Sequence, residues 1–105
     1  MSDQLYQDIG MQFASDHGVI SGQMFGKPCL KANNKAFAAF FKGEMVFKLG
    51  QEEISQIRDK YSGAVNWDPS GKKRPMKDWL QVPAEFGEDW ASLANQALDF
   101  VVGSK

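Results

Sequence analysis

The stretch from residue 24 to residue 49 constrains the fold of this chain most, because it is apolar, β-prone and interrupted by tight turns. It reads MFGKPCLKANNKAFAAFFKGEMVFKL, in which Asn33-Asn34 and Lys42-Gly43-Glu44 separate runs rich in Phe, Val and Ala. Turns this short join neighbouring antiparallel strands. We therefore predict three antiparallel strands, over residues 24–31, 35–41 and 44–49.

Two further strands are predicted over residues 64–67 and 76–82. Between them, Asp68-Pro69-Ser70-Gly71 has the Pro and Gly placement of a type I turn. Pro28 lacks a backbone N–H and cannot donate a ladder hydrogen bond. The strand over 24–31 is therefore expected either to lie at a sheet edge or to be broken at that residue.

Three helices are predicted around these strands: residues 2–17, a segment from Gly50 to Tyr61, and a segment from Pro83 to Val101. Each has apolar residues at helical spacing, and Gly18 supplies a stop for the first. The apolar stripes are Leu5, Ile9 and Phe13; Ile54, Ile57 and Tyr61; and Phe86, Trp90, Leu93, Ala97 and Val101. The predicted order is α-β-β-β-α-β-β-α. This pattern indicates an α+β fold, with a five-stranded antiparallel sheet and helices packed mainly on one face.

The composition indicates one folded domain over residues 1–105. Hydrophobic residues make up 43% of the 105, which is enough for a core, and no apolar run reaches the roughly 18 residues of a membrane span. Net charge is −1, but residues 24–83 are basic and both ends are acidic. The N-terminal sequence does not resemble a leader, and a single cysteine suits a reducing compartment. We expect a cytoplasmic protein.

The sequence offers little for catalysis. His17 is the only histidine and Cys29 the only cysteine, and no third residue is placed to orient them as a dyad. His17 is explained by its position at a helix C-terminus, and Cys29 by burial in a strand, although a reactive or redox-sensing thiol is the alternative. We expect no enzyme activity, no cofactor and no metal.

The densest positive patch is the connection between the last two predicted strands. Lys72, Lys73, Arg74 and Lys77 lie within six residues. Such a cluster is commonly just solvated, and its functional alternative is contact with phosphates. If nucleic acid binds this chain, we expect weak and nonspecific binding at these four residues, because the chain has no recognition-helix signature.

The second predicted strand is apolar on both sides, so both faces of the sheet need cover. Strict alternation places Phe37 and Phe41 on one side of that strand and Phe40 on the other. We predict that Phe37, Phe41 and Trp79 form an aromatic patch on the outer face, fringed by lysines, that binds a partner protein or a second copy. The alternative is that the third helix or a terminus covers this face.

The most distinctive residues are Met24-Phe25-Gly26, Phe37-Ala38, Phe47-Lys48, Met76 and Val82-Pro83. In this order and spacing they resemble the TfoX N-terminal domain family of bacterial proteins, over residues 24–102. In that family a further glycine usually follows the first motif, where this chain has Lys27, and Trp79 replaces an expected Tyr. Full-length TfoX-type regulators promote competence genes and carry a second, C-terminal domain. The resemblance implies a stand-alone, non-enzymatic module for protein interaction in transcription or competence-type regulation. A small-ligand or nucleic-acid binder that uses the basic segment is the alternative.

Overall fold

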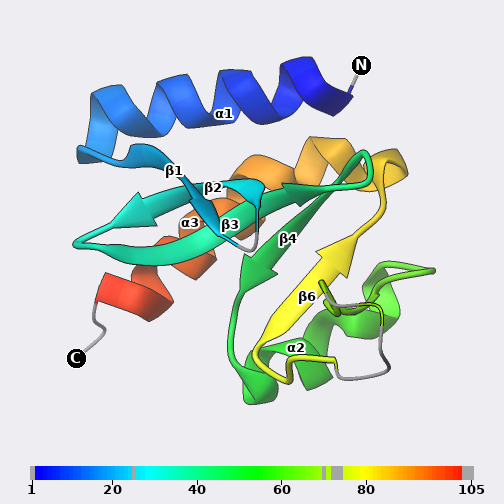
Figure 1. The fold of residues 1–105 in the computed structure, drawn as a ribbon. Helices are drawn as coiled ribbons and strands as arrows, with labels where there is room; N and C mark the ends of the chain where they lie inside the picture. Colours follow the sequence, from blue (N-terminus) through cyan, green and yellow to red (C-terminus); the bar gives the residue numbers. More distant parts are fainter. Residues whose placement is uncertain (1, 25, 70, 72–74, 103–105) are drawn as a thin grey trace.

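The computed structural model of this chain describes residues 2–24, 26–69, 71 and 75–102. Within these residues it is one α+β unit in which three α-helices and two short 3-10 helices accompany an antiparallel sheet (Figure 1). The elements are α1 (Ser2–His17), β1 (Ile20–Met24), β2 (Lys27–Ala32), β3 (Lys35–Phe41), β4 (Glu44–Lys48), α2 (Gln51–Ile57), η1 (Arg58–Lys60), β5 (Val65–Asn66), β6 (Trp79–Val82), η2 (Ala84–Asp89) and α3 (Trp90–Val102).

The sheet has six strands in the order β1-β2-β3-β4-β6-β5, so the predicted number of five is wrong. The extra strand is β1: no element is predicted over residues 20–23, and its last residue, Met24, is assigned to the strand predicted over 24–31. Gly26 has a φ of 74°, and Met24 pairs with Lys27 across a two-residue connection. A positive φ suits a hairpin turn and interrupts a strand. The chain therefore reverses direction between Met24 and Lys27, and β1 lies outside β2 at the edge of the sheet.

The two hairpin turns predicted from the sequence, at residues 33–34 and 42–44, are confirmed. Asn33 and Asn34 have φ values of 53° and 66°, and Lys42 and Gly43 have 52° and 79°. Each pair forms a two-residue loop, since Ala32 pairs with Lys35 and Phe41 with Glu44. Two successive residues with positive φ form a type I′ turn, whose twist matches that of the flanking strands. These turns hold β2, β3 and β4 in register.

A bulge in β3 resets the alternation of its side chains. Leu30 pairs with Ala38 but Lys31 pairs with Ala36, which leaves Phe37 as an extra residue. Such an insertion lets two successive residues point the same way. Phe37 and Ala38 accordingly both belong to the core under the helices, whereas Ala39 and Phe41 belong to the opposite face.

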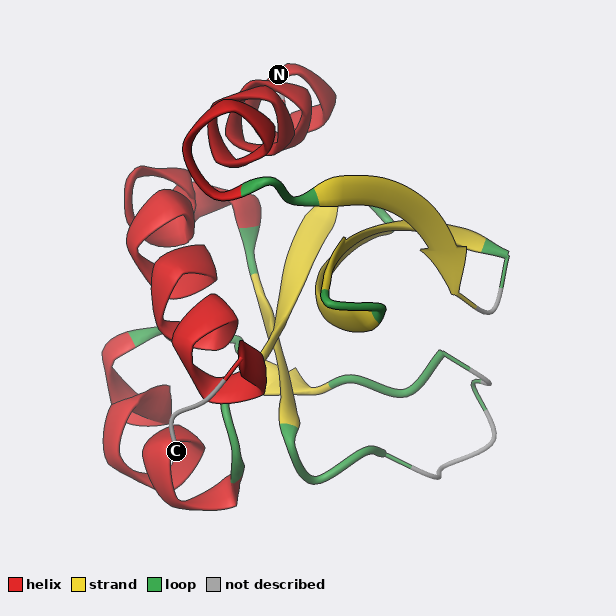
Figure 2. Cartoon of the chain, turned by 90° about the vertical axis from the view of Figure 1, so that its left-hand side faces the viewer, coloured by secondary structure: helices red, strands yellow, loops and turns green. Residues whose placement is uncertain are grey.

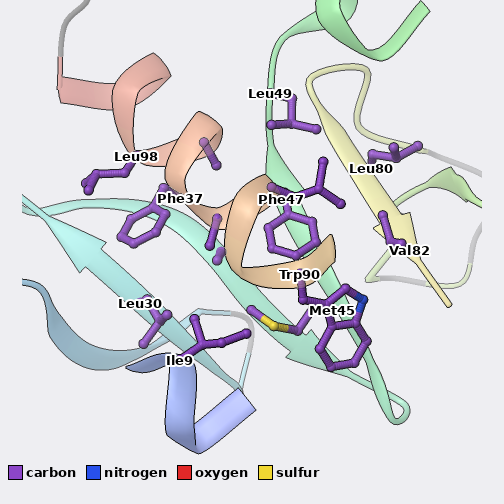
Figure 3. Packing of buried hydrophobic residues seen from close by; sticks show 14 of the residues in the cluster. Ile9, Leu30, Phe37, Met45, Phe47, Leu49, Leu80, Val82, Trp90 and Leu98 are labelled. Carbon is purple, nitrogen blue, oxygen red and sulfur yellow. The ribbon is translucent and has the colours of Figure 1, made fainter. Parts of the chain in front are cut away.

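The main core lies between the sheet and the helices (Figure 3). Figure 2 shows the helices together on one side of the sheet, as predicted. Met45, Phe47, Leu80 and Val82 point toward them from β4 and β6. The apolar stripes of the three helices supply the rest, among them Ile9, Phe13, Ile54, Trp90, Leu93 and Val101.

The opposite face of the sheet carries a second, smaller core. Its buried members are Cys29, Ala39, Phe41, Val46, Trp67 and Trp79. Trp67 begins the connection from β5 to β6, which Figure 2 shows on the side away from the helices. Its ring centroid lies 5.7 Å from that of Phe41 and 5.2 Å from that of Trp79. Its backbone pairs with Met76 (N···O 2.8 Å) and Trp79 (3.2 Å), so the chain itself closes this face.

Replacing Trp67 with alanine should lower the free energy of unfolding by about 3–5 kcal/mol, because a fully buried indole would leave a cavity. Val65→Ala is the matched control, since Val65 is half-exposed and its loss should change stability by no more than about 0.5 kcal/mol. Urea denaturation followed by circular dichroism measures both. Equal stability of the two variants would mean that Trp67 does not hold the second core together.

Candidate functional site

The predicted aromatic patch is not an exposed surface. Phe37 is fully buried under the helices, while Phe41 and Trp79 are 8% and 7% exposed within the second core. The expectation that these three rings share an open face is wrong, for two reasons. The bulge sends Phe37 to the helix side, and Trp67 covers the other two.

One part of that expectation is visible in the structure. The ammonium groups of Lys27 and Lys42 each lie 5.4 Å from the ring centroid of Phe41. At this distance a cation is attracted to the face of an aromatic ring. The lysine fringe therefore exists, but it borders a closed aromatic core and leaves little ring surface for a partner.

The predicted phosphate-contacting segment falls largely outside the described residues. Lys72, Lys73 and Arg74 are not among them, and Lys77, which is, lies exposed. The turn before them is formed as predicted, since the Gly71 N–H donates to the Asp68 carbonyl at 3.2 Å. After them, the Asn66 side-chain amide donates to the Lys77 carbonyl at 3.2 Å. These bonds anchor both ends of the segment.

The cysteine is buried rather than presented to solvent. Cys29 is 0% exposed, and desolvation by burial raises the pKa of its thiol, with Lys31 opposing the shift. Burial likewise raises the pKa of the nearby Tyr6 hydroxyl. A raised thiol pKa disfavours the reactive thiolate at neutral pH. This environment matches the expectation of an inert core residue.

The site that sequence reasoning missed is a groove between α2 and the end of α3. It is a shallow hollow of about 700 Å³ that is largely open to solvent. Figure 2 shows α2 near the C-terminal part of α3, and Gly50, just before α2, lies close to the Phe100 ring of α3. The lining residues are Leu49, Gly50, Gln51, Glu52, Glu53, Gln56, Asp78, Gln96, Asp99 and Phe100.

Gly50 lines this groove and lets the Phe100 ring approach the backbone closely. Its φ is 88°, and a Cβ there would lie 2.8 Å from Cε1 of Phe100. Only glycine accepts both the conformation and the close ring. The N–H groups of Leu49 and Gly50 both donate to the Asp78 carbonyl, at 2.9 and 3.1 Å. These two bonds fix the start of α2 against the segment that leads into β6.

The rim of the groove is acidic. Glu52 and Glu53 come from the first turn of α2, Asp78 from the segment before β6, and Asp99 from α3. No Lys or Arg is among its lining residues. On α3, Gln96, Asp99 and Phe100 share one face because they are three and four residues apart. Phe100 is 44% exposed, so the lining of the groove combines an accessible aromatic ring with four carboxylate side chains.

Only a partial signal for this groove is present in the sequence. Glu52 and Glu53 are explained locally, because acids in a first turn oppose the positive end of the helix dipole. Asp78 and Asp99 are far from them in sequence, and only the tertiary packing brings the four together. Phe100 lies outside the apolar stripe of α3. An aromatic residue in that position is expected to be exposed, and this was the one sequence feature that could have indicated a binding surface on α3.

Within the residues that the structure describes, no His, Cys, Asp and Glu side chains gather in a group of three that could hold a metal ion. Every helix there is too short or too polar to cross a bilayer.

A scan against protein-family models finds no match, and a search of the curated proteins finds no matching relative. The resemblance to the TfoX N-terminal domain therefore stands on the residues that carry it, and it stays a prediction.

Proposed function

We propose that this domain is a non-enzymatic, cytoplasmic interaction module with a regulatory role, as the TfoX resemblance implies, and that it binds a protein partner through the acidic groove. The observation that carries the proposal is the half-exposed Phe100 ring in a groove whose lining also includes four carboxylates and no Lys or Arg. Binding sites on proteins commonly combine an aromatic anchor with a polar rim. Transcription or competence-type regulation is the context that the resemblance suggests.

The chemistry of the groove defines the partner. Four carboxylates without a lining cation attract positive charge, and three glutamine amides add donors and acceptors. The apolar floor of Leu49, Gly50 and Phe100 favours an apolar side chain between the charges. The partner segment is therefore a basic peptide with lysines or arginines on either side of a leucine or an aromatic residue. Charge complementarity of this kind chiefly raises the association rate and sets specificity.

A fluorescent synthetic peptide with Lys and Arg around a central Leu should bind the chain, and Phe100→Ala should weaken it about tenfold by removing the anchor. Glu52→Gln and Asp99→Asn should each weaken it about twofold to fivefold, as expected for exposed charge pairs. Asp59→Asn is the control, because Asp59 is an exposed acid outside the groove. Fluorescence anisotropy measures all four.

Affinity capture from nuclease-treated native lysate then tests the physiological partner. Wild type should retain a protein that the combined Phe100→Ala, Glu52→Gln, Asp99→Asn variant loses and Asp59→Asn keeps. The proposal would be contradicted if the groove substitutions left the peptide affinity unchanged. It would also be contradicted if the combined groove variant retained the same proteins from the lysate as wild type.

A second candidate function is weak binding of nucleic acid by the basic segment. It is favoured by the concentration of Lys72, Lys73, Arg74 and Lys77 in one connection whose two ends are anchored. Because phosphate contacts release counterions, binding of duplex DNA should weaken by orders of magnitude when salt rises from about 50 to about 200 mM.

Lys72→Gln, Lys73→Gln and Lys77→Gln together should reduce that salt dependence, while Lys35→Gln, in a strand elsewhere, should leave it unchanged. Tight binding of one defined sequence at physiological salt would contradict this second candidate. Electrophoretic mobility shifts at several salt concentrations distinguish the outcomes.

A further inference from the structure

The outer edge of β1 is a strand-pairing surface that the groove does not use. β1 pairs with β2 over all five of its residues, and no other described strand pairs with its far side. Figure 2 shows the strand that follows α1 running along the margin of the sheet. An edge strand presents unpaired N–H and C=O groups, which can pair with another chain.

Proteins often protect such an edge with charged residues or proline, and β1 has neither. Its residues are Ile20, Ser21, Gly22, Gln23 and Met24, with no charge and no proline. Ile20 is 56% exposed, and Ser21 and Gln23 are also exposed. The opposite edge of the sheet, β5, has only two residues and is protected by its shortness.

The sequence of β1 is complementary to itself in one antiparallel arrangement. If two copies pair about Gly22, then Ile20 faces Met24 of the second copy, and Ser21 faces Gln23. Both pairings occur twice because the arrangement has twofold symmetry. Apolar residues then meet apolar ones, and neutral polar residues meet neutral polar ones, which are favourable cross-strand pairs.

We propose that the exposed edge of β1 pairs with β1 of a second copy of this chain, antiparallel about Gly22, to give a twofold homodimer with one continuous sheet. The interface is short, so the dimer is weak and in exchange with the monomer. It differs from the predicted dimer in its location, because Phe37, Phe41 and Trp79 take no part.

One charged side chain sets the salt dependence of this dimer. The Lys31 side chain lies over Gly22, with its Cε 3.1 Å from the position of a Cβ there. The twofold axis therefore brings two Lys31 side chains toward each other. Added salt screens this repulsion and should tighten the dimer, and Lys31→Gln should do the same. This direction is opposite to that expected for DNA binding by the basic segment.

Sedimentation velocity over a roughly hundredfold concentration range should show wild type shifting from monomer to dimer. In the double variant Ser21→Lys, Gln23→Lys, the lysine at 21 of each copy faces the lysine at 23 of the other. These two pairs of like charges should weaken the dimer about tenfold. In the double variant Ser21→Lys, Gln23→Glu, each lysine faces a glutamate of the other copy. The dimer affinity should then return to at least that of wild type. Val65→Lys, on the other edge, is the control and should leave it unchanged.

The charge-swapped variant also controls for folding, because it carries the same Ser21→Lys substitution as the weakened one. Wild type that stays monomeric throughout overturns the proposal. So does a dimer indifferent to the double lysine variant, or one that the lysine–glutamate variant fails to restore. A monomer whose β1 amides become protected from hydrogen exchange only with an added strand-forming peptide assigns the edge to a different partner and likewise overturns it.

Discussion

The extra residue at Phe37 decides how β3 distributes its aromatic side chains between the two faces of the sheet. Without it, Phe37 and Phe41 would share one face. With it, Phe37 joins the helix-side core, where its ring centroid lies 6.2 Å from that of Phe13, and Phe41 reaches the opposite side. One inserted residue thus lets a single apolar strand contribute to two cores.

The second core explains why the aromatic rings on the outer face of the sheet are buried. Trp67, from the connection between β5 and β6, lies against Phe41 and Trp79, and its backbone is bonded to Met76 and Trp79. In this chain a loop therefore covers the face that the helices leave free. The partner surfaces proposed above lie elsewhere, at the groove beside α2, at the basic residues 72–77 and at the edge of β1.

Local patterns in the sequence predicted much of the architecture. The Asn33-Asn34 and Lys42-Gly43 turns were predictable because their conformations are set by two residues. The helical stripes were predictable because their spacing is local. The bulge was not, since it depends on pairing between Leu30 and Ala38, and the hairpin at Gly26 was hidden within a run that reads as one strand. The groove was equally hidden, because Glu52 and Asp99 line the same hollow only after α2 and α3 pack.

The claim that the chain covers both faces of its own sheet is tested most directly by the accessibility of its three tryptophans. Trp67 and Trp90 are fully buried, and Trp79 is 7% exposed. Acrylamide quenching of native fluorescence should therefore be several-fold weaker than quenching of the urea-unfolded chain, with blue-shifted emission from a single inaccessible population. A readily quenched component as large as one of the three indoles, lost in Trp67→Phe or Trp79→Phe, would show that the outer face is open and would contradict the account.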